Sequence, residues 1–408
     1  MARQRSSPGL ASLDWLNFFV ATLQTGFGPF IAVYLTSQKW TQAGIGLALG
    51  IGTAVTLLSQ VPAGLLVDSV RSKRGAVFAA ILLVALSALL LAEVPYPLPV
   101  MGAQSLHGFA SCLLAPAIAA VTLRLTGTAG FAERIGRNAR FAALGCAAGA
   151  LGMGVCGTAL SSQSVFWLAA ALAAPAIAAL AVLQRAEPRA AAALPPQAGS
   201  ALSLLGDPRL LAFAGCVVLF HLCNAALLPL AAGTLTKHAG NAANLLIAVC
   251  VIGPQIVVAL LSPAAAAYAE RWGRRPIMLL GFAALPLRAV LFASASDPTQ
   301  LVLAELLDGV SATAFGVLIP LVAADLTRGT GRFNLCLGMV GLSCGVGATF
   351  STVLGGWLAT AAGTHAAFLA LAVAGLAAVF AVEIAMPETR MGLGAWRAAN
   401  PGAGLTGL

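Results

Sequence analysis

Two acidic residues lie where a helix in apolar surroundings would bury them. Glu305 and Asp308 are three residues apart in an apolar run over 299–327, so on a helix they share one face. Counting from Thr299 at the helical rise places them about 9 and 13 Å into a hydrocarbon layer about 30 Å thick. An ionisable side chain at that depth is expected to face the interior of a helix bundle. The pair is therefore suited to carrying protons or binding a cationic substrate.

Arg288 offers an alternative, a structural ion pair. It follows Pro276 by 12 residues, which is about 18 Å of helix and brings it to nearly the depth of the two acids. One carboxylate is expected to neutralise Arg288, and the second is then left over for proton exchange. Arg288 would suit an anionic substrate if it were itself the unpaired group.

A few uncharged polar side chains lie in other apolar runs. His107 and Gln104 occupy the positions that mirror Asp308 and Glu305 in an earlier run, and His221 precedes Asn224 by three residues. A histidine titrates near neutral pH and suits proton coupling, although a lone histidine in a helix bundle is more often a hydrogen-bonded packing residue. Gln24 and Asn224 are candidate substrate contacts or, equally, partners in interhelical hydrogen bonds.

Two short charged loops repeat one pattern. The first reads Gly64-Leu-Leu-Val-Asp68-Ser-Val-Arg71-Ser-Lys73-Arg74, and the second reads Glu270-Arg271-Trp-Gly273-Arg274-Arg275. A carboxylate near a helix N-terminus stabilises that end by about 0.3–1 kcal/mol when exposed. Asp68 is therefore suited to capping a helix end, and the alternative is a solvated turn that only sets topology. Asp325, just before Arg328, is expected to be a cytoplasmic gate or cap rather than a substrate ligand.

The amino-acid composition indicates that these residues lie in membrane-embedded segments. The chain has 408 residues, of which 60% are hydrophobic and only 9% charged, whereas soluble domains carry about 25% charged residues. This nearly excludes a soluble enzyme, a nucleic-acid-binding protein and a disordered scaffold, and it predicts a lipid-embedded protein despite the net charge of +9. The sequence has no P-loop, metalloprotease, nucleophile-elbow or dinucleotide motif in a suitable context. The eight cysteines lie in apolar runs without metal-ligand spacing, so no disulfide, metal or cofactor is expected.

Charges, prolines and glycines divide the chain into about twelve apolar runs, each long enough to span a membrane. The runs cover 14–36, 42–67, 75–94, 98–123, 138–160, 163–185, 208–236, 241–269, 276–294, 299–327, 333–361 and 363–385. A longer stretch, 186–207, separates the sixth from the seventh and has the Pro and Gly content of a polar linker. The sequence thus predicts an all-α protein with two six-helix bundles, 1–185 and 208–408, the second ending in a short tail. Asp14, near the start of the first run, is expected to reach water.

The basic residues fix an orientation. Alternate loops carry nearly all of them, namely Arg71, Lys73, Arg74, Arg124, Arg134, Arg137, Arg185, Arg189, Arg209, Arg271, Arg274, Arg275, Arg328 and Arg332. The other face has only Lys39 and Lys237, and the tails add Arg3, Arg5, Arg390 and Arg397. Basic loops stay in the cytoplasm. Both termini are therefore expected on the cytoplasmic side of a bacterial inner membrane.

The two halves match each other at a nearly constant offset. Asp68 and Glu270 are 202 residues apart, His107 and Asp308 are 201 apart, and Gln24 and Asn224 are 200 apart. Three markers in one order indicate a duplicated six-helix unit. Parallel repeats with a binding site between them are a common plan in secondary transporters.

Six plus six runs joined by a central linker resemble the major facilitator superfamily. The resemblance covers nearly the whole chain, and its most specific motif is the family's second-to-third loop, G-x-L-x-D-R-x-G-R-[RK]. Gly64, Leu66, Asp68 and the trailing basic residues match that motif, whereas Ser69 and Arg71 replace its first Arg and its mid-loop Gly. The second copy keeps Arg271, Gly273, Arg274 and Arg275, with Glu270 in place of the Asp. The resemblance implies alternating access, with Asp68 and the second loop at a cytoplasmic gate.

Finer resemblances point in two directions. Glycine-rich segments over 145–154 and 338–347 resemble the antiporter motif of drug:proton exporters, without its Gly-Pro step, and Gln104 replaces the exporters' arginine. Met386-Pro-Glu-Thr-Arg390 resembles the P-E-T motif of sugar porters, with no other sugar-porter signature beside it. The resemblance implies a monomeric, proton-coupled exporter of a small molecule. The alternatives are an uptake porter for a sugar, carboxylate or siderophore, and a sensor or scaffold that moves no substrate.

Overall fold

The computed structural model describes residues 8–27, 29–40, 42–185, 206–231, 243–328 and 330–390. Most of the expected linker, Lys237 and the tail residues Arg3, Arg5 and Arg397 lie outside these ranges. Within the described ranges all regular structure is helical, which confirms the predicted all-α class.

The helices follow the expected apolar runs. They are α1 (Pro8–Thr25), α2 (Pro29–Ser37), α3 (Gln42–Ser69), α4 (Lys73–Glu93), α5 (Pro97–Ala159), α6 (Ser164–Arg185), α8 (Pro208–Asn224), α10 (Ala243–Trp272), α11 (Arg274–Ser294), α12 (Pro298–Leu326), α13 (Phe333–Ala362) and α14 (Thr364–Ala385). Ten of the described helices are long and apolar enough to span a membrane. Large apolar side chains such as Ile384, 84% exposed, and Leu58, 75% exposed, cover their outer faces. Those faces suit lipid rather than water.

Two elements depart from one helix per span. The α5 helix has 63 residues, about 95 Å of rise, which is three times the hydrocarbon thickness. Its backbone leaves the helical region at Gly127, where φ is +62°, so α5 supplies both the fourth and the fifth span. The first span is conversely divided into α1 and α2. With these two adjustments, each of the twelve expected spans has its helix.

The first and seventh spans break at equivalent places, where the sequence predicted continuous helices. The first break follows Thr25, and the N–H of Phe27 donates to the carbonyl of Gln24. In the seventh span α8 ends at Asn224, and the freed N–H of Ala226 donates to the Ser351 hydroxyl at 3.0 Å. A backbone group in a membrane must find such an internal partner.

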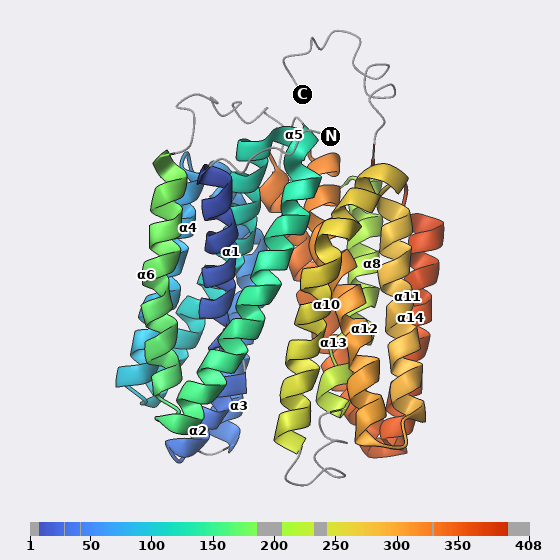
Figure 1. Cartoon of the computed structure of the whole chain (residues 1–408). Helices are drawn as coiled ribbons and strands as arrows, with labels where there is room; N and C mark the ends of the chain where they lie inside the picture. Colours follow the sequence, from blue (N-terminus) through green and yellow to red (C-terminus); the bar gives the residue numbers. More distant parts are fainter. Residues whose placement is uncertain are drawn as a thin grey trace. The chain divides into compact units, whose positions relative to one another are not determined.

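The described residues cluster into two compact units. Unit 1 comprises Met1–Leu125 and Arg137–Leu194, and unit 2 comprises Thr126–Gly136 and Pro195–Leu408. Residues 126–136, which include the break in α5 at Gly127, belong with unit 2, where Phe131 packs edge-on against Phe333 of α13. Within unit 2, α11 packs along α12 and α14 (Figure 1).

Small residues allow close helix packing in both units, and they do so at matched places. A Cβ at Gly145 would lie 2.2 Å from the carbonyl oxygen of Phe18, and one at Gly347 would lie 2.3 Å from that of Val218. The two glycines are 202 residues apart, which is the offset between Asp68 and Glu270. Close backbone approach through small residues is the usual way in which membrane helices associate.

Candidate functional site

Three helices of unit 2 bring four of the predicted residues together. Arg288 of α11 forms an ion pair with Asp308 of α12 through Nη1, and the same atom lies 3.6 Å from Oε2 of Glu305. The Nη2 group of Arg288 donates to Oδ1 of Asn224 in α8. The four side chains form what we call the Arg288 cluster.

Local sequence positions three members of the Arg288 cluster. Pro298, in the first turn of α12, and the Asp297 cap that accepts from the N–H groups of Thr299 and Gln300 fix where α12 begins. The two acids follow on one face. Asn224 is the last residue of α8 before the break, so its side chain lies where the helix stops.

Burial differs sharply within the Arg288 cluster. The side chains of Arg288 and Glu305 are each 2% exposed, whereas that of Asp308 is 26% exposed. Among the described residues, Oε2 of Glu305 and Nε of Arg288 have no hydrogen-bond partner. Arg288 therefore lies within ion-pair distance of both acids, with the closer contact to Asp308, so two carboxylates face one guanidinium.

An aromatic group lies beside the Arg288 cluster in unit 2. Phe315 stacks on Phe220 with centroids 4.6 Å apart, and the ring of His221 meets Phe315 edge-on at 4.8 Å. His221 is half-buried, and its Nε2 has no hydrogen-bond partner among the described residues. His221 thus packs as an aromatic residue and leaves one nitrogen unused.

The predicted polar residues of unit 1 form no comparable charged group. The ring of His107 stacks on Phe27 at the break of the first span, 3.9 Å between centroids, and its Nε2 lies 3.2 Å from the Ser111 hydroxyl. Gln104 is 4% exposed, and its amide nitrogen has no hydrogen-bond partner among the described residues. Gln24 is half-buried just before the break.

The first loop motif ties α3 to α4. Buried Lys73 donates through Nζ to the carbonyls of Val67, Asp68 and Val70, which caps the end of α3. Asp68 itself is half-buried and Arg71 is exposed. Gly64 is buried in α3, and Arg74 is half-buried in the first turn of α4.

The second loop motif is built around a buried arginine. Arg274 pairs with Glu270 at 2.6 Å and with Asp325 at 3.1 Å, and it donates to the carbonyl of Ala269 at 3.0 Å. These contacts connect α10, α11 and α12 at one end of unit 2. They place Asp325 among basic side chains, within ion-pair distance of both Arg274 and Arg328.

One residue for which the sequence predicts no role is important at this end of unit 2. Glu388, beyond α14, accepts hydrogen bonds from the backbone N–H groups of Arg274 at 2.8 Å and Arg275 at 3.1 Å, and so caps α11. Gly273 precedes that cap at a φ of +102°. Arg390 adds a hydrogen bond to the carbonyl of Arg271. The sequence signal for this cap is the Met386–Arg390 motif, which contains both Glu388 and Arg390.

The predicted exposure of Asp14 is wrong. Its side chain is 4% exposed and accepts three hydrogen bonds from Arg137 of α5, the shortest of them 2.6 Å. Its partner Arg137 lies 123 residues later in the sequence, so the residues around Asp14 give no sign of the ion pair.

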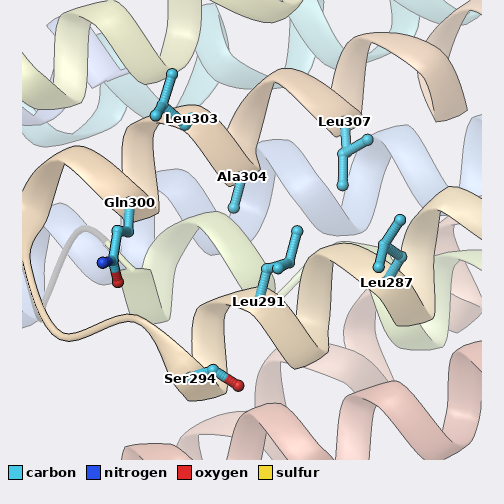
Figure 2. A pocket seen from close by; sticks show the side chains of 7 residues that line it. All are labelled: Leu287, Leu291, Ser294, Gln300, Leu303, Ala304 and Leu307. Atoms are coloured by element: carbon cyan, nitrogen blue, oxygen red, sulfur yellow. The ribbon is translucent and has the colours of Figure 1, made fainter.

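A separate cavity of about 470 Å³ lies between α11 and α12, towards the loop that joins them. Figure 2 shows leucines from the two helices facing each other across it, with Ser294 and Gln300 at the loop end. The lining residues are Leu287, Leu291, Ser294, Gln300, Leu303, Ala304 and Leu307. None of the predicted site residues lines it.

Comparison with known proteins gives the family. A model described as Major Facilitator Superfamily matches residues 13–232 and again 213–397. An uncharacterized MFS-type transporter of Mycobacterium tuberculosis is 36% identical over 390 residues, which is 93% of both chains. A multidrug resistance protein B homolog from that organism is 29% identical over 140 residues, 34% of this chain and 25% of that one.

Solved structures show the same fold at low identity. The fucose transporter FucP, in its outward conformation, matches with a TM-score of 0.73 and 14% identity over 94% of this chain and 99% of that one. The nucleoside transporter NupG matches with a TM-score of 0.64 and 18% identity over 93% and 99% of the respective chains. With the family model covering both halves, the chain belongs to the major facilitator superfamily and is a multi-pass, non-enzymatic membrane transport protein.

Proposed function

We propose that the protein exports a small molecule from the cytoplasm in exchange for protons, by alternating access. The observation that carries this proposal is the Arg288 cluster, in which two carboxylates share one arginine inside a membrane bundle. Ionisable groups at such depth mark proton or substrate pathways. At least one of the two acids, Glu305 or Asp308, is the proposed proton carrier.

The remaining predicted residues have supporting roles in this proposal. Asn224 holds Arg288, His221 lies beside the cluster, and Gln24, Gln104 and His107 are proposed cargo contacts contributed by unit 1. The loops at Asp68 and Glu270 are proposed as cytoplasmic gate elements, with both termini inside a bacterial inner membrane. We also propose a monomer, with residues 1–185 and 208–408 as its bundles and 186–207 as its linker.

Export is favoured over uptake by the resemblance to exporters. The glycine-rich fifth and eleventh spans resemble the antiporter motif, and one relative of partial length is named a multidrug resistance protein B homolog. Everted vesicles, in which the cytoplasmic face is outside, separate the two directions. An exporter accumulates labelled cargo in these vesicles when a proton gradient is imposed, and an uptake porter does so in right-side-out vesicles.

Proteoliposomes with an internal pH dye test proton coupling. Pools of candidate substrates are added to the wild type, to a Glu305→Gln/Asp308→Asn double variant, and to a Glu93→Gln control at the exposed end of α4. We expect substrate-dependent proton movement in the wild type and the control, and none in the double variant. Equal proton movement in the double variant would remove the acids from the mechanism. Substrate binding without flux would favour the sensor alternative.

A further inference from the structure

We propose that the Arg288 cluster selects a protonated amine, which binds Asp308 while Arg288 turns to Glu305. This inference rests on the proposed function, because it names the substrate class of the same site. It gives different roles to Glu305 and Asp308, which the sequence alone does not distinguish. Asp308 contacts the cargo, and Glu305 is a reserve partner for the arginine.

The first support is an acceptor that stands unused. Nη1 of Arg288 contacts Asp308, yet it lies only 3.6 Å from Oε2 of Glu305. That oxygen has no hydrogen-bond partner among the described residues, nor has Nε of Arg288. Charge-assisted N–H···O bonds are about 2.7–2.9 Å long, so a shift of roughly 1 Å would complete the Arg288–Glu305 pair. Arg288 can therefore leave Asp308 without losing a carboxylate partner.

Exposure decides which acid meets the cargo. Asp308 is 26% exposed, whereas Glu305 and Arg288 are 2% exposed. A solute can touch the Asp308 carboxylate without unpacking the bundle, and it cannot touch the other two charges. The cargo contact is therefore an acid rather than the arginine.

Charge balance favours a cation over an anion. Two carboxylates and one guanidinium leave the ionised cluster with one excess negative charge. A cation on Asp308 gives two neutral pairs, one with the cargo and one between Arg288 and Glu305. An anion on Arg288 would instead strand two carboxylates in the bundle, and an unpaired buried charge is strongly destabilising.

The surroundings favour an amine that carries an aromatic body. Phe315 lies seven residues after Asp308 and so shares its face of α12. It is half-buried, with His221 edge-on beside it. An aromatic side chain about 10 Å along the helix from a carboxylate, on the same face, suits a cation whose apolar ring is joined to it by a short chain. An ammonium also has N–H groups to donate to Asp308, which a quaternary nitrogen lacks.

The exchange has an electrical consequence. Asp308 holds either one proton or one ammonium, so each turn exchanges one positive charge for another. We therefore expect a pH difference to drive transport, and a membrane potential imposed at equal pH to have no effect on it.

Binding to the purified full chain in lipid nanodiscs tests the assignment. The probes are phenethylamine, phenylacetate and 2-phenylethanol, which share one ring and differ in charge. We expect phenethylamine alone to bind, with affinity lower by at least tenfold in Asp308→Asn and unchanged in the Glu93→Gln control. In Glu305→Gln, Arg288 would have no second partner, so affinity should fall about 100-fold. Adding Arg288→Gln to Glu305→Gln removes the stranded charge and should restore affinity to within about threefold of the wild type.

The rescue distinguishes this proposal from a simple proton role for Glu305, because removing Arg288 cannot replace a lost proton site. Each variant is compared by size-exclusion profile and thermal unfolding, so that only folded protein is scored. Phenylacetate binding that needs Arg288, absence of phenethylamine binding, or absence of rescue would each overturn the amine assignment. Amine binding through Asp308 with no proton movement would keep the assignment and overturn the proposed proton coupling. If another cargo moved protons in protein that does not bind phenethylamine, the proposed proton coupling would stand and the amine assignment would be overturned.

Discussion

The carboxylate of Glu388 occupies the space that a side chain at Gly273 would need. A Cβ at Gly273 would lie 2.3 Å from Oε2 of Glu388, and Gly273 also has a φ of +102°. The residue beyond the last helix and the glycine before α11 are therefore mutually dependent. The second loop motif therefore includes a residue beyond α14, whereas the sequence predicted only a loop between two consecutive helices.

We predict that Gly273→Ala destabilises the protein more than Gly363→Ala does. Gly363 has a similar backbone, with φ of +89°, but an added Cβ there would meet open space. Both variants incur about 1–3 kcal/mol of backbone strain. Gly273→Ala additionally loses the Glu388 cap. Thermal unfolding of the purified variants measures the difference, and equal losses would show that the cap contributes nothing.

Glu388→Gln should lower stability by about 0.5–1 kcal/mol, because a neutral amide caps a helix N-terminus less well than a carboxylate. Glu383→Gln is the matched control. Its carboxylate is 57% exposed, pairs with Arg275 and accepts no backbone N–H bond in the described residues. Denaturation midpoints at low and high salt report the effect. A larger loss from Glu383→Gln than from Glu388→Gln would contradict the capping role.

Gly347→Ala should destabilise unit 2 by about 1–3 kcal/mol, because α13 and α8 must move apart to admit a methyl group. The added Cβ would lie 2.3 Å from the carbonyl oxygen of Val218 and 2.9 Å from Cβ of His221. Gly356→Ala, on the same helix with nothing within 4 Å, should be neutral or slightly stabilising. The unfolding temperatures of the two variants are compared in the same detergent. Equal unfolding temperatures would contradict the close packing of α13 against α8 at Gly347.

A double-mutant cycle on Asp14→Asn and Arg137→Gln should give a coupling of about 1 kcal/mol. The bonding is bidentate, but Arg137 is 47% exposed, so solvent screens the pair. The coupling should shrink as ionic strength rises. Additive single-variant effects at low salt would mean that α1 and α5 are not joined through this pair.

Counting residues along helices was enough to predict part of the cluster. The helical rise from each end put Arg288 and the two acids at one depth, and the ion pairs confirm that they meet. The sequence could not show that Asp308 is partly exposed and Glu305 buried, because exposure depends on how α12 packs against α10 and α11. The hydrogen bond from Arg288 to Asn224 crosses 64 residues, and no local pattern encodes it.

Long-range partners also explain the errors. Asp14 was expected in water because its position near the start of a run was visible and its partner Arg137 was not. The break in the first span did have a local signal, because Gly26 and Pro29 flank Phe27, and both residue types interrupt helices. The twelve spans themselves followed from composition alone, since length and apolarity are what a bilayer selects.

The Arg288 cluster also bears on how the chain is made. A carboxylate at the centre of a membrane helix raises the free energy of insertion by about 2.5–3.5 kcal/mol, and α12 carries two acids. The compensating arginine lies on α11, which is synthesised just before it and is joined to it by residues 295–297. The two helices can therefore enter the bilayer as a hairpin with its charges already paired. Loss of Arg288 alone should then appear first as poor membrane integration, so the amount of protein in the membrane fraction reports on assembly before any flux is measured.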